Sequence, residues 1–331
     1  MKAMDETRLS VLIPNYNNGP YLKEALDSLF AQTYTNFIIY FVDDCSTDNS
    51  LEIAESYKDD RLVIIEKDSN SGIVDTMNVA LNRIETEYYI RMDGDDISTP
   101  ERFQKLVDFM DQNSEIGVCS SSIETFGIEN KVRVFEKSPL MNSANLIFGH
   151  SIGHASSIFR TAVMKENKIE YVDRFWRLED YYLFYRLKDL TLTTAIPDKF
   201  YLYRQAAYNN NAEITQRKNL AFKAFYEMVL TDLGIEASDK NLSVHLQLNN
   251  RGKSTFGLKD YQNHIELLRE ANKKSLLYPV AELEKVLSRH LEKIYYQLID
   301  QKKITLFQIW GLGEHKKALL KYYLGTRLGK K

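Results

Sequence analysis

The first 120 residues alternate between short apolar runs and helical patterns, and this alternation constrains the fold more than any other feature. Runs such as LSVLIP at 9–14 and FIIYFV at 37–42 predict buried strands. Strands that alternate with helices through short links form a parallel sheet covered on both faces. We therefore predict an α/β fold, with strands at 9–14, 37–42, 62–66, 88–92 and 117–120 and helices at 21–32, 48–57, 73–84 and 100–112.

The rest of the chain follows other patterns. Residues 121–205 are less regular and predict a mixture of sheet extensions, loops and short helices. Beyond Glu213 the chain is mainly helical. We expect helices at 213–233, 259–273, 279–299 and 304–324, and three parts bounded by 1–120, 121–210 and 211–331.

Three carboxylates, Asp93, Asp95 and Asp96, follow the predicted strand at 88–92 with one glycine among them. Burying three acids together is unfavourable unless a positive charge lies among them. Carboxylates on a sharp turn suit a hard divalent cation, Mn²⁺ or Mg²⁺, which completes its shell with water and substrate phosphates. The ordinary alternative is a solvated acidic turn before a helix that starts near Pro100.

Polar residues also follow the other strands, at the sheet edge where parallel α/β folds bind ligands. Asp43 and Asp44 are adjacent acids that repel each other unless they accept hydrogen bonds, and the uracil imide and ribose hydroxyls of a nucleotide would supply donors. Pro14 and Tyr16 suit either a plain turn or a nucleotide border. The stretch 70–72 suits a helix cap or a loop beside the same ligand.

Charge is unevenly distributed. Residues 302–331 hold eight Lys or Arg and one acid, whereas the whole chain has a formal net charge of −3. This basic, aromatic segment predicts either peripheral contact with an anionic membrane or a helix that packs on the body with a solvated basic face. Cys45 and Cys119 form no disulfide framework, and no signal peptide or apolar run of 18 residues is present, so we expect a cytoplasmic protein.

Six motifs in order resemble family 2 glycosyltransferases with the GT-A fold. They are LSVLIPNYN, VDDCSTDNS, NSG before a helix, YYIRMDGDDISTPERF, HASSIFR and LEDYYLFYRL, which together span about the first 205 residues. The resemblance implies a mostly parallel Rossmann-like sheet, with a nucleotide-sugar half at 1–120 and an acceptor half at 121–210. The helical region at 211–331 adds nothing to the match.

The resemblance also implies roles on the donor side. The donor would be a nucleoside diphosphate sugar, usually a UDP-sugar, used with a divalent metal. Pro14 and Tyr16 would border the base and Asp43 or Asp44 would recognise it. Asp93 would contact ribose or the metal, Asp95 would be the principal metal ligand, and Asp96 would cap the next helix or support the metal.

On the acceptor side the resemblance assigns the catalytic base to Asp180, beside Glu179. Its ordinary alternative is that both acids simply start a helix. Trp176 would form a platform for a sugar ring, unless it is an ordinary buried tryptophan. The resemblance places His154 on the acceptor side and gives His150 no role.

Two positions depart from the family pattern. Ala206 stands where many relatives carry histidine, which leaves Arg204 as a phosphate partner. The stretch 73–78 has no arginine, so the diphosphate would depend more on the metal.

We therefore predict a metal-dependent inverting glycosyltransferase that extends a cell-surface glycan such as capsule, lipopolysaccharide or a lipid-linked oligosaccharide, with no nucleic-acid partner. One alternative is a GT-A scaffold that binds nucleotide-sugar or glycan without turnover. A nucleotidyltransferase is a second, which the absence of Lys or Arg from 14–19 disfavours.

Overall fold

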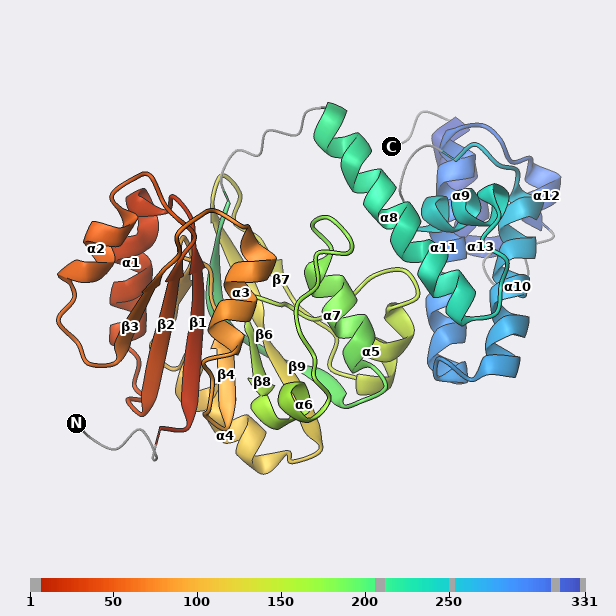
Figure 1. Cartoon of the computed structure of the whole chain (residues 1–331). Coiled ribbons are helices and arrows are strands. Elements are labelled where there is room, and N and C mark those ends of the chain that lie inside the picture. Colours follow the sequence, from red (N-terminus) through yellow and green to blue (C-terminus); the bar gives the residue numbers. More distant parts are fainter. Residues whose placement is uncertain (1–6, 206–211, 250–253, 311–315, 328–331) are drawn as a thin grey trace. The chain divides into compact units, whose positions relative to one another are not determined.

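The computed structural model describes residues 7–205, 212–249, 254–310 and 316–327. The chain divides into two compact units (Figure 1). The α/β unit comprises Met1–Asn142 and His150–Asn210, and the helical unit comprises Ser143–Gly149 and Asn211–Lys331. Ala206, and with it the predicted departure at that position, lies outside the described residues.

Four parallel strands form one half of the sheet, and the acidic motifs lie at the carboxyl ends of two of them. In spatial order they are β3 (Leu62–Glu66), β2 (Phe37–Asp43), β1 (Leu9–Asn15) and β4 (Tyr88–Arg91). For these four strands the predicted bounds agree with the observed ones to within a residue at either end.

The other half of the sheet is mixed. Beyond β4 follow β8 (Ser157–Arg160), β6 (Ile116–Gly127), β9 (Leu192–Gln205) and β5 (Ile97–Ser98), with β7 (Val132–Arg133) on β6. Strand β8 runs antiparallel to β4 and β6, whereas the long β6–β9 ladder is parallel. The predicted strand at 117–120 was too short. Strand β6 continues to Gly127 through a stretch rich in polar residues, which has too little apolar character to predict a buried strand.

Alternate residues of the parallel strands pack on opposite faces of the sheet. Leu9, Val11 and Ile13 of β1 share a buried core with α1 (Gly19–Phe30) and α4 (Arg102–Gln112). Helix α3 (Ile73–Leu81) contacts β1 and β2, and in Figure 1 it lies in front of the sheet. Both faces are thus covered, as predicted for buried parallel strands.

Shorter helices complete the α/β unit. They are α2 (Ser50–Ser56), α6 (Thr161–Glu166) and α7 (Glu179–Leu187), and α5 (Pro139–Asn145) runs into the helical unit.

The helical unit contains α8 (Ala212–Asp232), α9 (Asp239–Leu248), α10 (Leu258–Ser275), α11 (Val280–Asp300), α12 (Leu306–Trp310) and α13 (Lys316–Arg327). Sequence reasoning missed α9, whose buried face includes a histidine rather than only apolar residues. Within the predicted helix at 304–324 the structure describes α12 and, from Lys316 on, α13, and residues 311–315 lie outside the described residues.

A short segment from the middle of the chain belongs to the helical unit. The Phe148 carbonyl accepts hydrogen bonds from the Tyr226 hydroxyl at 2.6 Å and from Asn249 Nδ2 at 2.6 Å. The Phe148 ring also contacts the rings of His245 and His290, with centroids 4.7 and 4.2 Å apart. None of the helices in the described ranges combines the length and the apolar character needed to cross a bilayer.

Candidate active site

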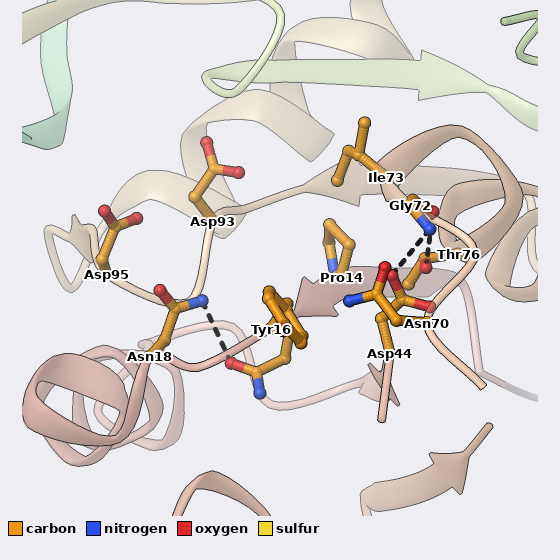
Figure 2. Close-up of a pocket in the computed structure, with 11 residues that line it drawn as sticks. Pro14, Tyr16, Asn18, Asp44, Asn70, Gly72, Ile73, Thr76, Asp93 and Asp95 are labelled. Atoms are coloured by element: carbon orange, nitrogen blue, oxygen red, sulfur yellow. Dashed lines mark hydrogen bonds between the residues drawn. The ribbon is translucent and has the colours of Figure 1, made fainter. Parts of the chain in front are cut away.

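A pocket of about 360 Å³ opens at the carboxyl ends of the parallel strands. Figure 2 shows Asp93 and Asp95 on one side of it and Asp44 and Gly72 on the other, with Tyr16 between them. The pocket is lined by Pro14, Asn15, Tyr16, Asn18, Asp44, Asn70, Gly72, Ile73, Thr76, Asp93 and Asp95. The structure therefore brings together residues from four predicted strand ends, as expected for this class of sheet.

Asp43 is buried and is held by the chain itself. One carboxylate oxygen accepts hydrogen bonds from Asn15 Nδ2 at 2.8 Å and Ser46 Oγ at 2.6 Å, and the other accepts from the Ser46 amide at 2.8 Å. Asn15 and Asp43 are direct neighbours in the β1–β2 ladder. Asp43 does not line the pocket, so its contacts fix the ends of β1 and β2.

Asp44 does line the pocket and is also held by chain donors. Its Oδ1 accepts from Lys67 Nζ at 2.7 Å and the Ser71 amide at 3.0 Å. Its Oδ2 accepts from the Gly72 amide at 2.8 Å (Figure 2). Gly72 has a φ of +88°, a conformation that favours glycine. Burial alone would raise the pKa of Asp44, but Lys67 and the two amides together lower it.

The need for nucleotide donors that we inferred for the adjacent acids is therefore met from within the chain. A carboxylate offers about four acceptor sites, and three hydrogen bonds to Asp44 are described above. Asp44 thus keeps acceptor capacity at the pocket wall, whereas Asp43 is directed into the protein.

Asp93 forms an ion pair with Arg91 at the end of β4. Arg91 Nη1 donates to Asp93 Oδ2 at 2.7 Å, and the second guanidinium nitrogen contacts the other carboxylate oxygen. The Asp93 amide donates to the Tyr201 hydroxyl at 3.2 Å, which ties this turn to β9. Asp93 is thereby oriented at the pocket while its charge is balanced on one side.

The surroundings of Asp95 and Asp96 raise the pKa of each carboxyl, whereas those of Asp44 lower its pKa. Burial and the neighbouring charge of Asp93 raise the pKa of Asp95. Burial, Asp93 and Asp95 likewise raise the pKa of Asp96. Negative charge at this turn is therefore only partly compensated by the protein.

Of the two roles predicted for Asp96, capping of the next helix was wrong, and support of the metal stays a prediction. Asp96 accepts hydrogen bonds from the Tyr201 hydroxyl at 2.6 Å and from the Arg204 amide at 2.7 Å, and β5 separates it from α4. It therefore joins the acidic turn to β9, because its side chain points to the neighbouring strand rather than along the chain.

The donor set at this turn fits a hard divalent cation that keeps several non-protein ligands. Among the described residues, no three His, Cys, Asp or Glu side chains gather in a metal-binding arrangement. Asp93 and Asp95 both line the pocket, and a cation there would relieve the repulsion that raises the pKa of Asp95. Mg²⁺ sites of this kind use one or two carboxylates together with substrate phosphates.

Arg204 is engaged by the protein around this turn. Its Nε donates to the Asp95 carbonyl at 2.8 Å, and its guanidinium forms an ion pair with Glu24. The same group lies over the rings of Tyr21 and Phe126, 4.5 and 4.4 Å from their centroids. These contacts make Arg204 a support for the Asp95 backbone, and its predicted phosphate contact stays a prediction.

Asp180 lies outside the lining of this pocket, in the first turn of α7. Its Oδ1 accepts from the Tyr181 amide at 2.7 Å, and its Oδ2 lies 3.2 Å from His150 Nε2. Glu179 precedes it, and burial together with Asp180 raises the pKa of Glu179. Both acids thus start the helix, as the ordinary alternative required, but Asp180 also has a specific partner.

His154 is neutral and is bonded to a buried tyrosine. Burial and the charge of Arg91 lower the pKa of His154 to about 3. Its Nε2 lies 2.9 Å from the Tyr171 hydroxyl, and the Tyr171 backbone is held by Asn78 of α3 at 2.8 and 2.9 Å. Trp176, the predicted sugar platform, is half-buried, and the Arg177 guanidinium lies 4.9 Å from its ring centroid.

Sequence reasoning missed four residues that shape the site: Lys67, Arg91, Tyr171 and Tyr201. For Lys67 and Arg91 a signal existed, because each is a basic residue at or just past the end of an apolar strand that is followed by polar residues. Tyr171 and Tyr201 carried no such signal, since their partners are distant in the sequence.

The model for glycosyl transferase family 2 matches residues 10–210 of the chain. An uncharacterized glycosyltransferase of Haemophilus influenzae is 27% identical over 305 residues, which cover 86% of this chain and 91% of the relative. The poly(ribitol-phosphate) beta-N-acetylglucosaminyltransferase TarS of Staphylococcus aureus is 27% identical over 67% of this chain and 39% of TarS.

Among solved structures, TarS 1–349 in complex with UDP matches with a TM-score of 0.56 and 21% sequence identity, covering 85% of this chain and 90% of that chain. The predicted fold is thereby confirmed. Because the family model covers more than half of the sequence, the chain belongs to glycosyl transferase family 2.

Proposed function

We propose that the protein is an inverting, metal-dependent glycosyltransferase. It would move a sugar from a nucleoside diphosphate, with UDP favoured, to a glycan or lipid-linked acceptor in cell-surface polysaccharide synthesis. The observation that carries this proposal is the pocket that joins Tyr16 and Asp44 to Asp93 and Asp95 at one sheet edge. The walls of this pocket suit a nucleotide whose base lies beside Tyr16 and Asp44 and whose diphosphate lies near Asp93 and Asp95.

Base recognition would fall to Asp44 rather than Asp43. The acceptor capacity left on Asp44 suits the imide N–H of uracil, and Lys67 with the amides of Ser71 and Gly72 holds the carboxylate in place. Tyr16 is 48% exposed and offers its ring at the same pocket. The UDP and UDP-GlcNAc complexes of TarS support a uridine nucleotide.

Asp93 and Asp95 would hold the cation, Mn²⁺ or Mg²⁺, with the donor diphosphate and water as further ligands. When bound, the cation would neutralise charge that builds on the leaving diphosphate. Arg91 would keep Asp93 oriented through its paired contacts.

Asp180 would act as the base on the acceptor side. Inversion requires that the acceptor oxygen attack the anomeric carbon from the face opposite the diphosphate while a base removes its proton. The Tyr181 amide holds the Asp180 carboxylate in a defined orientation for this step.

The test is a panel of nucleotide sugars with Mn²⁺ or Mg²⁺, scored for nucleoside diphosphate release and sugar transfer with and without EDTA. We expect EDTA-sensitive transfer from one donor that is lost in Asp95→Asn and kept in the exposed control Asp60→Asn. Nucleotide binding without release from any donor would favour the non-catalytic scaffold. Pyrophosphate release from a nucleoside triphosphate would favour a nucleotidyltransferase.

A second part of the proposal concerns the last helices, which would contact an anionic membrane at the site of glycan synthesis. Helix α12 buries Ile309 but leaves Phe307 87% and Trp310 63% exposed. Lys317 and Lys321 of α13 are exposed as well. Exposed aromatic residues beside cations suit the interface of a bilayer that contains anionic lipids.

Sedimentation with vesicles of phosphatidylglycerol and phosphatidylcholine tests this part. Replacing Phe307 and Trp310 with serine should weaken vesicle binding by at least about tenfold, because two aromatic side chains lose their burial. Val280→Ser, which changes a 53% exposed apolar residue elsewhere in the helical unit, should not. Equal binding to purely zwitterionic vesicles, or full binding by the double variant, would contradict the membrane contact.

A further inference from the structure

His150 lies beside Asp180, and the family resemblance gives His150 no role. Its Nε2 lies 3.2 Å from Asp180 Oδ2, and its Nδ1 lies 2.9 Å from the Ile152 carbonyl oxygen. A carbonyl oxygen only accepts hydrogen bonds, so Nδ1 must carry a proton. In the neutral ring Nε2 is therefore the nitrogen that can take up a proton, and it faces the carboxylate.

Both groups are held in this orientation. The His150 ring packs on the Phe184 ring with centroids 5.5 Å apart and also contacts Tyr181. The Tyr181 amide occupies Asp180 Oδ1 and leaves Oδ2 to the imidazole. The side chains of His150 and Asp180 are 28% and 31% exposed, so a proton can leave the pair for solvent.

The charges around the pair favour a proton on the imidazole. Burial alone would lower the pKa of His150, but Asp180 raises it above its ordinary value. Burial alone would raise the pKa of Asp180, but His150 lowers it. His154 also lowers the pKa of Asp180, and Asp180 in turn raises the pKa of Glu179.

We propose that His150 receives, through Asp180, the proton of the attacking acceptor hydroxyl. This inference rests on the proposed function. As the acceptor oxygen bonds to the anomeric carbon, the bond from that carbon to the diphosphate oxygen breaks and its electron pair leaves with the diphosphate. The hydroxyl proton passes to the Asp180 carboxylate and from Oδ2 to Nε2, and solvent later removes it.

A carboxylate with lowered basicity cannot keep the proton, so an adjoining imidazole makes the transfer more favourable. The active form then has an ionised Asp180 and a neutral His150. Activity should therefore rise with pH as His150 loses its proton, and this rise should lie above pH 6.5, the ordinary pKa of histidine.

The experiment compares kcat against pH for the full-length protein, His150→Gln and His150→Asn, with the donor identified by the panel. Glutamine places an amide N–H near the position of Nε2 and can orient Asp180, but it accepts no proton. Asparagine is too short to reach Asp180 and can only satisfy Ile152. Thermal melting and UDP affinity report whether each variant keeps the fold and the donor site.

We expect both variants to lose about 10²-fold in kcat, with the KM for the donor unchanged and the rising limb shifted to lower pH. If glutamine restores kcat and the wild-type pH profile, His150 only orients Asp180 and the inference is overturned. If glutamine prevents folding, an unaltered profile in His150→Asn overturns it equally. Sugar transfer that is still lost in Asp95→Asn would show that the proposed function survives such a result.

Discussion

The two acidic motifs look alike in the sequence but differ in how the protein treats their charge. Asp43 ends β2 and Asp44 follows it, and chain donors reach each of their four carboxylate oxygens. Asp95 and Asp96 follow β4, burial and the charge of Asp93 raise the pKa of both, and Asp95 raises that of Asp96 further. One motif is compensated from within the protein, and the other retains an excess of negative charge.

This difference distinguishes acids that form a fixed part of the pocket wall from acids that are suited to bind a cation. Compensated acids such as Asp44 hold loops in place and present a fixed surface, here through Lys67 and the 71–72 amides. Uncompensated acids are kept at a cost in stability, and a cation from outside the chain would remove that cost. The excess charge, rather than the number of acids, therefore indicates the proposed metal centre.

The largest effect should come from removing the uncompensated charge. Asp95→Asn should lower kcat by about 10³-fold, since metal stabilisation of the leaving group contributes several kcal/mol. The variant should also lose the rise in melting temperature that Mn²⁺ with UDP produces in the wild type. A variant with full activity, or with an undiminished Mn²⁺-dependent melting shift, would remove the basis for contrasting the two motifs.

An intermediate effect should distinguish the two compensated acids from each other. Asp44→Asn should weaken UDP binding by about 30-fold, because an amide nitrogen cannot accept the uracil imide proton and a hydrogen bond to a charged group contributes about 2 kcal/mol. Asp43→Asn should instead lower the free energy of unfolding and leave UDP affinity almost unchanged. Isothermal titration and chemical denaturation of both variants measure these quantities. The reverse pattern would mean that Asp43 faces the nucleotide.

Most of the parallel half of the sheet could be predicted, because its strands are apolar runs separated by helical patterns. The choice between Asp43 and Asp44 could not be made, since successive side chains of a strand point to opposite sides and only the register assigns them. In the structure Asn15 pairs with Asp43 across β1 and β2, and this pairing directs Asp43 inward.

The acceptor side was less accessible to sequence reasoning. Asp180 could be selected only through the family resemblance, because an acid at a helix start is common. Its contact with His150 joins residues 30 apart in the sequence, with β8 and α6 between them, and Asp96 reaches Tyr201 across 105 residues. No local rule predicts such contacts, since they depend on how β8, β9 and α7 pack after the sheet has formed.

The smallest effect tests whether Lys67 is what compensates Asp44. The two side chains are only 11% and 5% exposed, so solvent screens their interaction weakly. Lys67→Met should lower the free energy of unfolding by about 1.5 kcal/mol at pH 7, at the lower end expected for a hydrogen bond between charged groups. The same change in an Asp44→Asn background should cost less, because the two residues act together.

The pH dependence of that difference follows from the direction of the shift. The pKa of Asp44 is lowered in the folded protein, so its contribution to stability is complete above the unfolded pKa and disappears as pH falls through the folded value. Without Lys67, only the two amides oppose the effect of burial, so the pKa of Asp44 is higher than in the wild type. Urea unfolding of wild type and Lys67→Met should therefore differ most near neutral pH and converge in acid. A gap that stays constant down to acid pH would mean that Lys67 stabilises the loop through the hydroxyls of Ser71 and Thr76, which do not titrate, and that the amides alone compensate Asp44.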